Sequence, residues 1–247
     1  MKLRVIGCAG GFPLGNNGTS SYIVTSTEGN YHLLLDAGSG SALKIEQYLD
    51  VNQLNAVLVS HDHPDHTADL GIFQHLFLLK KPEPRHMPIP IYSHPNSEFA
   101  KLLTTSDSSE PKIYQPDETL ELGPFAITFE KTVHPLECYA MRIEEKETGK
   151  VFVYTADSAW HEPLIEFSKE ADLLVADANF SNEVGRNDKH MTAEEVGQLA
   201  TQAKVKQLAA SHIPPQADRG LIIGQIAAAL DDKVTLLECY PGAEFKI

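Results

Sequence analysis

Four side chains that can bind a metal ion lie within six consecutive residues of this chain. They are His61, His63, Asp65 and His66. They follow the apolar run 56–59, which is typical of a buried strand. Because extended backbone places residues i and i+2 on the same side, His61 and His63 can bind one ion. Pro64 then turns the chain, so that Asp65 and His66 can reach a second ion. Groups this close repel one another or stay neutral without a cation, so the spacing predicts a two-metal site.

A two-metal site needs further ligands from distant segments, and loops at strand ends are suited to hold them on a rigid sheet. Three residues meet this requirement because each follows a strand-like apolar run: His134, Asp157 and His212. Any one of them taken alone would be interpreted as a structural histidine or a turn aspartate. Together with the first four, they form an ordered set of nitrogen and oxygen ligands spread along the chain.

The His-x-His-x-Asp-His spacing resembles the signature of the metallo-β-lactamase superfamily, and the three distant residues match the later motifs of that family in order. The resemblance implies a binuclear centre in which Asp157 bridges both ions. It implies these ligand sets: His61, His63 and His134 on one metal, and Asp65, His66 and His212 on the other. Neutral imidazole and carboxylate ligands suit Zn²⁺ best, although Mn²⁺, Fe²⁺ and Ni²⁺ accept the same set.

Two segments resemble the ribonuclease Z-like branch of this superfamily. They are the glycine-rich start, residues 7–13, and the segment around the third histidine, residues 133–142, which lacks the Gly-His-Thr of glyoxalase II and lactonase relatives. In this branch, the second catalytic histidine and its acidic partner would be His190 and Asp177. The chain departs from the branch pattern here, because Asp177 replaces the usual Glu and Met191 the usual Ser. The local sequence also predicts a helix that starts near Thr192.

The tRNA-processing members of the branch carry a long arm between the third-histidine and bridging-aspartate motifs. Here His134 and Asp157 are 23 positions apart, which leaves room for two strands and a turn but for no arm. The net charge is −14, and the 20 Lys and Arg residues form no sustained cluster. Long nucleic acid is normally bound by basic surface, so this chain is not expected to bind it, and tRNA 3′ cleavage is disfavoured. A small anionic substrate remains compatible, since two cations would make the site locally positive.

The resemblance therefore implies a phosphodiesterase that acts on a small phosphodiester, cyclic ones included. Metal coordination brings the pKa of water towards 7, so hydroxide would be available near neutral pH. This hydroxide, bridging the two ions, would attack the phosphorus. Asp65 would hold this nucleophile as well as a metal. His190, oriented by Asp177, would stabilise charge or protonate the leaving alkoxide. The relatives that share this pattern are commonly homodimers.

Two other classes of function use the same residues. An acyl hydrolase of the lactonase or thioesterase type would use the same metals and water, and would hydrolyse acyl-lactones but not bis(p-nitrophenyl) phosphate. A non-hydrolytic member would be a binding module or a diiron redox protein. The redox relatives would be expected to have Glu in place of His63 and an attached flavin domain, neither of which the chain has.

The elements that must position these residues can be read from hydrophobic periodicity. The expected strands are 3–7, 22–25, 31–36, 56–60, 89–92, 125–131, 139–144, 151–154, 173–176, 207–210 and 234–237. The expected helices are 41–48, 69–80, 95–105, 162–169, 192–203 and 221–230, and 104–112 is expected to be an exposed polar loop. The resemblance implies an α+β class fold, the αββα four-layer sandwich, in which two mixed sheets carry helices on their outer faces.

Composition agrees with a single enzyme domain spanning residues 1–247. The 42% hydrophobic and 22% charged residues are ordinary for a globular protein. The longest apolar runs are of strand length, far below the roughly 20 residues that a membrane helix needs. The first residues have too short an apolar stretch for a signal peptide, so a cytoplasmic location is expected. The three cysteines, which are widely spaced and lack a C-x-x-C pair, are expected to be small core residues rather than disulfides or zinc ligands.

Overall fold

The computed structural model describes residues 1–80 and 88–247, and their contacts divide the chain into two compact units. The first unit comprises Met1–Gln115 and Tyr240–Lys246, and the second comprises Pro116–Cys239 and Ile247. The single domain expected from composition stays a prediction. Among the described residues, no helix combines the length and apolar character that crossing a membrane would require.

The first unit contains a mixed sheet that has eight strands among the described residues. The strands are β1 (Lys2–Ala9), β2 (Gly18–Thr19), β3 (Ser21–Thr25), β4 (His32–Leu35), β5 (Ala56–Leu58), β6 (Ile89–Ser93), β7 (Ser109–Ile113) and β15 (Glu244–Lys246). The order is β15-β1-β3-β4-β5-β6-β7, with β2 beside β1. Strands β4 to β7 are parallel, so the chain leaves β4, β5 and β6 at the same edge of the sheet.

Short helices pack on one face of this sheet. They are α1 (Ser41–Ile45), α2 (Pro64–Thr67) and α3 (Leu70–Leu79), with 3₁₀ turns at Val51–Gln53 and Phe99–Leu102. The apolar sides of α1 and α3 form a core with alternate residues of the strands, for example Ile6, Ile23 and Leu34 with Ile45 and Phe73. Alternation explains this arrangement, because residues two apart on a strand share one face.

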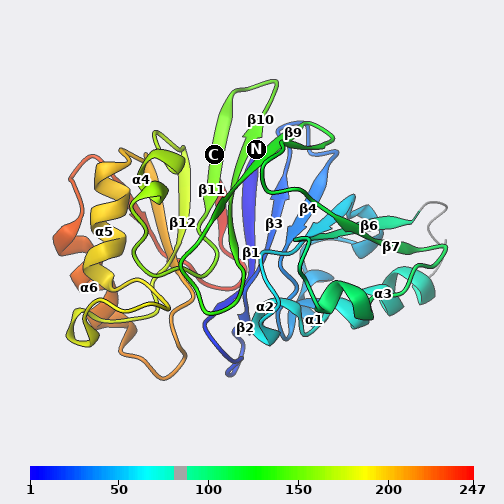
Figure 1. Ribbon diagram of the computed structural model, residues 1–247, viewed down its shortest axis with the longest axis horizontal. Coiled ribbons are helices and arrows are strands. Elements are labelled where there is room, and N and C mark those ends of the chain that lie inside the picture. The colour runs from blue at the N-terminus through cyan, green and yellow to red at the C-terminus, as the bar shows by residue number, and fades with distance from the viewer. Residues whose placement is uncertain (81–87) are drawn as a thin grey trace. The chain divides into compact units, whose positions relative to one another are not determined.

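The second unit contains another mixed sheet, in the order β14-β13-β12-β11-β10-β9-β8 over the residues that the structure describes. The strands are β8 (Leu120–Leu122), β9 (Phe125–Lys131), β10 (Tyr139–Glu145), β11 (Lys150–Tyr154), β12 (Leu173–Asp177), β13 (Gln207–Ser211) and β14 (Thr235–Leu237). The helices are α4 (Pro163–Phe167), α5 (Ala193–Gln202) and α6 (Arg219–Ala229), with a 3₁₀ turn at Asn182–Val184. Helices α5 and α6 lie together beside the parallel strands (Figure 1).

The start of α5 is as the sequence predicts. Thr192 is the N-cap, its hydroxyl accepts a hydrogen bond from the Glu195 backbone N–H, and the Glu195 side chain accepts from the Thr192 N–H. This capping box fixes the direction in which the chain enters the helix. Between His134 and Asp157, the described chain contains the hairpin β10–β11 and no long insertion, which agrees with the expected absence of an arm.

Two predictions of secondary structure were wrong. Residues 95–105 do not form a long helix, because the Asp62 carboxylate accepts hydrogen bonds from Ser97 Oγ (2.6 Å) and the Glu98 N–H (2.7 Å) and holds only a short turn. Residues 109–113 are not a loop but the edge strand β7. Its polar sequence and Pro111 are tolerated because one side of an edge strand needs no ladder partner. The short strands β2, β8 and β15 were also not predicted.

Helix α3 has the expected bounds, but its apolar stripe is only partly core. Leu70, Phe73 and Phe77 are buried, whereas Leu79 is 65% exposed. Helix α1 ends at Ile45, earlier than expected, and residues 46–48 form turns. The three cysteines are buried and make no disulfide, as predicted.

The backbone of the candidate metal-binding segment packs closely against Gly38. A Cβ atom at Gly38 would overlap the carbonyl oxygen of Asp65 and the Thr19 hydroxyl. Replacing Gly38 by alanine should therefore lower the free energy of unfolding by about 1–3 kcal/mol, the usual cost of overpacking, and lower the metal content. Chemical denaturation and elemental analysis measure both.

Gly224→Ala is the matched control, because the added Cβ would meet open space inside a helix. This change should raise stability by about 0.4–1 kcal/mol. If Gly38→Ala is as stable as the parent and binds as much metal, the close packing of Gly38 against Asp65 is not needed for stability or for metal binding.

Candidate metal centre

The first unit brings together the histidines that follow β5. His61 is fully buried and His63 is half-buried, and the distance from His61 Nε2 to His63 Nδ1 is 3.0 Å. The two ring nitrogens therefore face the same point, as two ligands of one ion would. This pairing agrees with the extended backbone expected for the His-x-His segment.

Asp65 and His66 lie on the short helix α2, which has Pro64 in its first turn. Proline suits this position because the first helical N–H has no partner within the helix. Both side chains are buried, and His66 Nε2 lies 3.8 Å from Asp65 Oδ2. The Gly11 N–H donates to the same Asp65 oxygen at 2.8 Å, so the glycine-rich segment contacts this cluster.

A buried network behind the histidines fixes which nitrogen faces the cluster. Asp36 Oδ2 is 2.7 Å from His66 Nδ1 and accepts a hydrogen bond from Ser60 Oγ at 2.9 Å. Ser60 Oγ is also 3.0 Å from His61 Nδ1. Both imidazoles can thus donate through Nδ1, His66 to the carboxylate and His61 to the hydroxyl, which directs the lone pair of each Nε2 towards the cluster. Metal-binding histidines are typically oriented in this way.

The second unit brings together the three distant ligands of the sequence prediction. Asp157 Oδ2 lies 3.4 Å from His212 Nε2 and 3.8 Å from His134 Nε2, and all three side chains are buried. His134 Nδ1 donates to the Lys189 carbonyl at 2.9 Å, which again leaves Nε2 facing the carboxylate. Burial lowers the pKa of His134, the direction that favours the neutral imidazole that metals bind.

His190 and Asp177, the branch-specific pair, are in direct contact in this unit. His190 Nδ1 is 2.8 Å from Asp177 Oδ2, and the His190 ring lies against those of His212, His134 and Phe180. Burial lowers the pKa of His190, but the charge of Asp177 and its hydrogen bond outweigh burial, and the pKa is raised overall. The substitution of Asp for Glu thus does not prevent the contact. The same pair, with Asp157 and His212, presents ligand atoms within 4.8 Å of one another.

Left-handed backbone occurs at several of these positions. Asp36, Ala156 and His212 have φ of 53°, 51° and 57°. Such values are uncommon outside glycine, and strained residues of this kind cluster at functional sites. At Ala156 the conformation sets the direction of the next residue, Asp157, and at His212 it sets the direction of the imidazole itself. His134 and Asp157 follow their strands by a few residues, and His212 follows β13 directly.

The donor set of each unit fits a divalent cation. Each cluster combines buried imidazoles with a carboxylate, the ligand types of Zn²⁺ and related ions, and several imidazoles are oriented by a second hydrogen bond. Such a concentration of buried titratable groups is costly unless they are paired or bind a cation.

The sequence did not single out the residues that orient the ligands. These are Asp36, Ser60 and Asn179, whose side-chain amide donates to the His212 carbonyl at 3.1 Å. A signal existed for the first two, because Asp36 directly follows strand β4 and Ser60 directly precedes His61. The pattern alone could not show that their side chains reach the imidazoles.

Asp36 gives a testable prediction, because one carboxylate accepts from His66 and from both the hydroxyl and the N–H of Ser60. In Asp36→Asn an NH₂ group, which donates, replaces one of the two carboxylate oxygens, which accept. The three hydrogen bonds therefore cannot all be kept. Metal affinity should fall roughly 10–100-fold, the usual effect of losing such a partner. Competition with a chromogenic chelator measures it.

Asp69→Asn is the control for that experiment, because Asp69 accepts from the Ala42 N–H and bonds to no histidine within residues 1–80 and 88–247. It should leave metal affinity unchanged. Equal affinities of the Asp36 and Asp69 variants would show that Asp36 does not orient a metal ligand.

Comparison with known proteins identifies the family. A model of the Beta-lactamase superfamily domain matches residues 31–213. The chain is 43% identical over 220 residues to the "Probable metallo-hydrolase YhfI" of Bacillus subtilis, with 87% of each chain covered. The crystal structure of YhfI, a metallo-beta-lactamase fold protein from that organism, matches with a TM-score of 0.90 at 36% identity, over 99% of this chain and 98% of YhfI.

More distant structures share the fold. The short form of human tRNase Z matches with a TM-score of 0.75 at 17% identity, over 100% of this chain and 99% of that chain. A diphosphatase from the PhnP family matches with a TM-score of 0.74 at 18% identity, over 100% and 97%. The expected superfamily and fold are thereby confirmed: the chain belongs to the beta-lactamase superfamily and has the metallo-β-lactamase fold.

Proposed function

We propose that this protein is a binuclear metal-dependent hydrolase that cleaves a small phosphodiester, cyclic ones included. The observation that carries the proposal is the contact between half-buried His190 and buried Asp177, a pair that lies against the proposed ligand His212 in the second unit. A hydrolase that must expel an alkoxide needs a positioned proton donor beside its metal ligands. Hydrolysis as the type of reaction is supported by membership of the family and by the similarity to YhfI.

The seven predicted ligands are proposed to act as one centre. They are His61, His63, Asp65, His66, His134, Asp157 and His212. Support comes from the family pattern and from the donor cluster that each unit carries by itself. Two divalent cations bound there would supply a hydroxide nucleophile near neutral pH and would polarise a phosphoryl oxygen. The proposed ions are Zn²⁺, with Mn²⁺, Fe²⁺ or Ni²⁺ as the other cations that suit these ligands.

The residues of the chain have distinct proposed tasks. Asp157 is proposed to bind both ions, and Asp65 to bind one ion and to position the nucleophile. His190 would give its proton to the leaving oxygen, while Asp177 keeps the ring oriented and stabilises its charged form. The raised pKa of His190 is in the direction that a proton donor needs.

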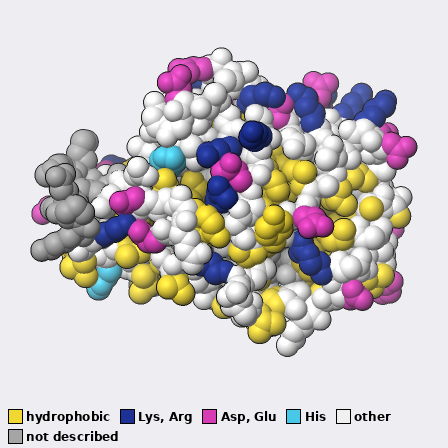
Figure 2. Space-filling model, turned by 180° about the vertical axis from the view of Figure 1, so that it is seen from behind, with side chains coloured by type: hydrophobic (Ala, Val, Ile, Leu, Met, Phe, Trp, Pro, Cys, Tyr) yellow, Lys and Arg dark blue, Asp and Glu magenta, His cyan; other side chains and the backbone are white. Residues whose placement is uncertain are grey.

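A small substrate is favoured by the charge of the surface. The net charge is −14, and on the face shown in Figure 2 the Lys and Arg side chains lie among acidic and hydrophobic ones. Long polyanions are bound by continuous basic surface. The similarity to a diphosphatase agrees with a small substrate that contains phosphorus. A homodimer and a cytoplasmic location remain predictions from the sequence.

A substrate panel tests the proposal. Protein that has been stripped by a chelator and reconstituted with Zn²⁺ or Mn²⁺ is assayed on bis(p-nitrophenyl) phosphate, cyclic nucleotides, an acyl-lactone and a precursor tRNA. Metal-dependent turnover of the phosphodiesters, with none of the lactone, is the expected result. Turnover of the lactone alone would instead indicate an acyl hydrolase. Cleavage of precursor tRNA alone would indicate a tRNA endonuclease.

A further inference from the structure

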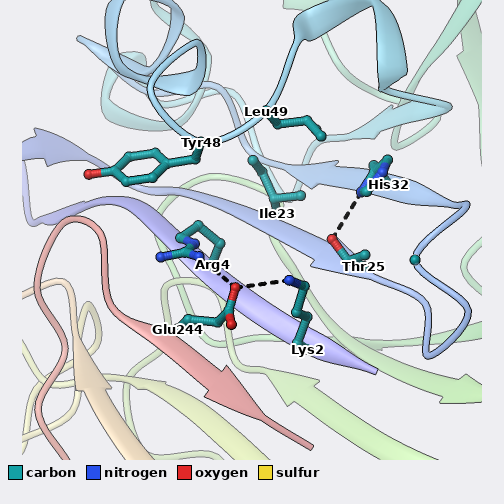
Figure 3. Close-up of a pocket in the computed structure, with 9 residues that line it drawn as sticks. Lys2, Arg4, Ile23, Thr25, His32, Tyr48, Leu49 and Glu244 are labelled. Carbon is teal, nitrogen blue, oxygen red and sulfur yellow. Dashed lines mark hydrogen bonds and ion pairs between the residues drawn. The ribbon is translucent and has the colours of Figure 1, made fainter.

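A polar hollow in the first unit contains none of the candidate metal ligands. It is a pocket of about 170 Å³. Its lining residues are Lys2, Arg4, Ile23, Thr25, Gly29, His32, Tyr48, Leu49 and Glu244 (Figure 3). His32 begins strand β4, whereas Asp36, the partner of His66, directly follows its end. The pocket and the metal-ligand cluster of this unit are thus at opposite ends of one strand.

Strand register explains why these residues meet. Lys2 is opposite Thr25, and Thr25 is opposite His32, so three strands contribute one polar row. Arg4 is opposite Glu244 on β15 and opposite Ile23 on β3, which makes a neighbouring row. Residues two apart on a strand share a face, so both rows lie on the face that Ile23 and Ile6 contribute to the helix-covered core.

The helices that pack on this face of the sheet do not cover the two polar rows, which line the pocket. Tyr48 and Leu49, which follow α1, form the upper rim of the hollow in Figure 3. The Tyr48 ring is held in place by the Arg4 guanidinium, 5.2 Å from the ring centre. The result is a hollow with cations and an imidazole on the strands and an aromatic and an aliphatic side chain at the rim.

The charges of the hollow are preorganised. Lys2 Nζ and Arg4 are bound to the same Glu244 oxygen at 3.0 and 2.5 Å, and Arg4 also donates to the Gly242 carbonyl at 2.7 Å. Two positive charges and one negative charge leave an excess of one positive charge, on a protein whose net charge is −14. Glu244 holds both cations in position, so a ligand would not have to order them. One anionic group balances the remaining charge.

The fourth polar group is His32. Thr25 Oγ1 lies 3.0 Å from His32 Nδ1, so a ligand would contact this imidazole through Nε2. Burial lowers the pKa of His32, and the charge of Lys2 lowers it further. The titratable or charged side chains that line the pocket together with His32 are Lys2 and Arg4 on β1, Glu244 on β15 and Tyr48, whose hydroxyl points away from His32 in Figure 3. A bound anion would oppose the effect of Lys2 and would raise this pKa.

We propose that this pocket binds a small organic monocarboxylate, with its carboxylate at Lys2 and His32 and its apolar part against Ile23, Leu49 and Tyr48. The size agrees, because a cavity of about 150 Å³ holds a benzene molecule. Pockets for drug-sized ligands are larger, at roughly 300–1,000 Å³. The site would be separate from the proposed catalytic centre, and it does not depend on the reaction at that centre.

Side-chain NMR of His32 tests the proposal, with benzoate as the probe and benzamide as its neutral analogue. Benzoate should shift the His32 ring signals saturably, raise the pKa of His32 and bind more tightly below that pKa than above it. Benzamide should have little effect. The Asp157→Ala variant, which is expected to be poor in metal, should give the same result, which excludes carboxylate bound to metal as the cause.

A matched pair of variants completes the test. Lys2 and Lys146 each form an ion pair with a glutamate and have side chains 47% exposed. Lys2→Gln should weaken benzoate binding roughly tenfold, as expected for loss of a charged hydrogen bond, and should raise the pKa of His32 in the free protein. Lys146→Gln should change neither.

Three results would overturn the proposal. They are a benzoate-independent pKa of His32, equal effects of benzoate and benzamide, and equal effects of the two lysine variants. If Lys2→Gln fails to fold, His32→Gln with benzoate affinity measured by calorimetry decides the question instead, because this change keeps the size of the side chain. Unchanged affinity in that variant would also overturn the proposal.

Discussion

Replacing Asp157 by alanine should lower the metal content from about two ions per chain to one or none and reduce hydrolysis to background. The reason is the position of this carboxylate in the second unit, where Oδ2 lies within 3.8 Å of the Nε2 atoms of both His134 and His212. Because Asp157 is proposed to bind both ions, its loss would remove a contact from each. Elemental analysis of the purified variant, with circular dichroism to show that it is folded, is the measurement.

Asp172 provides the control, because it is a buried aspartate of the same unit outside the cluster. Lys150 and Lys206 bind its carboxylate, and despite burial these contacts lower its pKa to about 2. Asp172→Asn should therefore lower the stability of the fold but leave the metal content of the folded protein unchanged. Retention of two ions in Asp157→Ala would remove the assignment of this residue as a bridging ligand.

Replacing His190 by alanine should keep both ions and slow the hydrolysis of substrates with a poor alkoxide leaving group by roughly 10²–10⁴-fold, the usual contribution of a positioned acid. A p-nitrophenolate leaving group needs little protonation, so its release should slow much less. The ratio of the two losses separates a proton donor from a residue that has only a structural role. Rates on an alkyl and on a p-nitrophenyl phosphodiester give this ratio.

His161 is the matched control for His190. It is also a histidine of the second unit paired with a carboxylate, Glu130, at 3.2 Å, but it lies outside the ligand group. His161→Ala should slow neither substrate. Equal losses on both substrates in His190→Ala, or a parallel loss of metal, would show that His190 is a ligand or an electrostatic stabiliser rather than an acid.

The sequence predicted those parts of the fold that have a clear period or a cap. Strands β9, β10 and β13 alternate or are continuously apolar, and α5 has a capping box, so their bounds were found to within a residue or so. Edge strands such as β7 and β15 were not predicted, because most of their residues are polar and their pairing depends on neighbours far away in the chain. Burial and register, which decide such strands, are not local properties.

The residues that cluster in the candidate site could be predicted from the sequence, but the groups that orient them could not. The spacing of His61 to His66 and the order of the later motifs identified residues that the structure places in two clusters, one in each unit. The partners that orient them were missed, because Asp36 and Lys189 contact histidines 30 and 55 positions away. Side-chain and carbonyl contacts over such separations leave no periodic signal in a single sequence.

The most direct test of a binuclear metal-dependent phosphodiesterase is the titration of metal-free protein with Zn²⁺ or Mn²⁺ while the hydrolysis of a phosphodiester is followed. Activity should be absent without metal and should rise until about two equivalents per chain are bound, as expected for a two-metal site. A plateau at one equivalent, or activity that does not depend on added metal, would contradict this account.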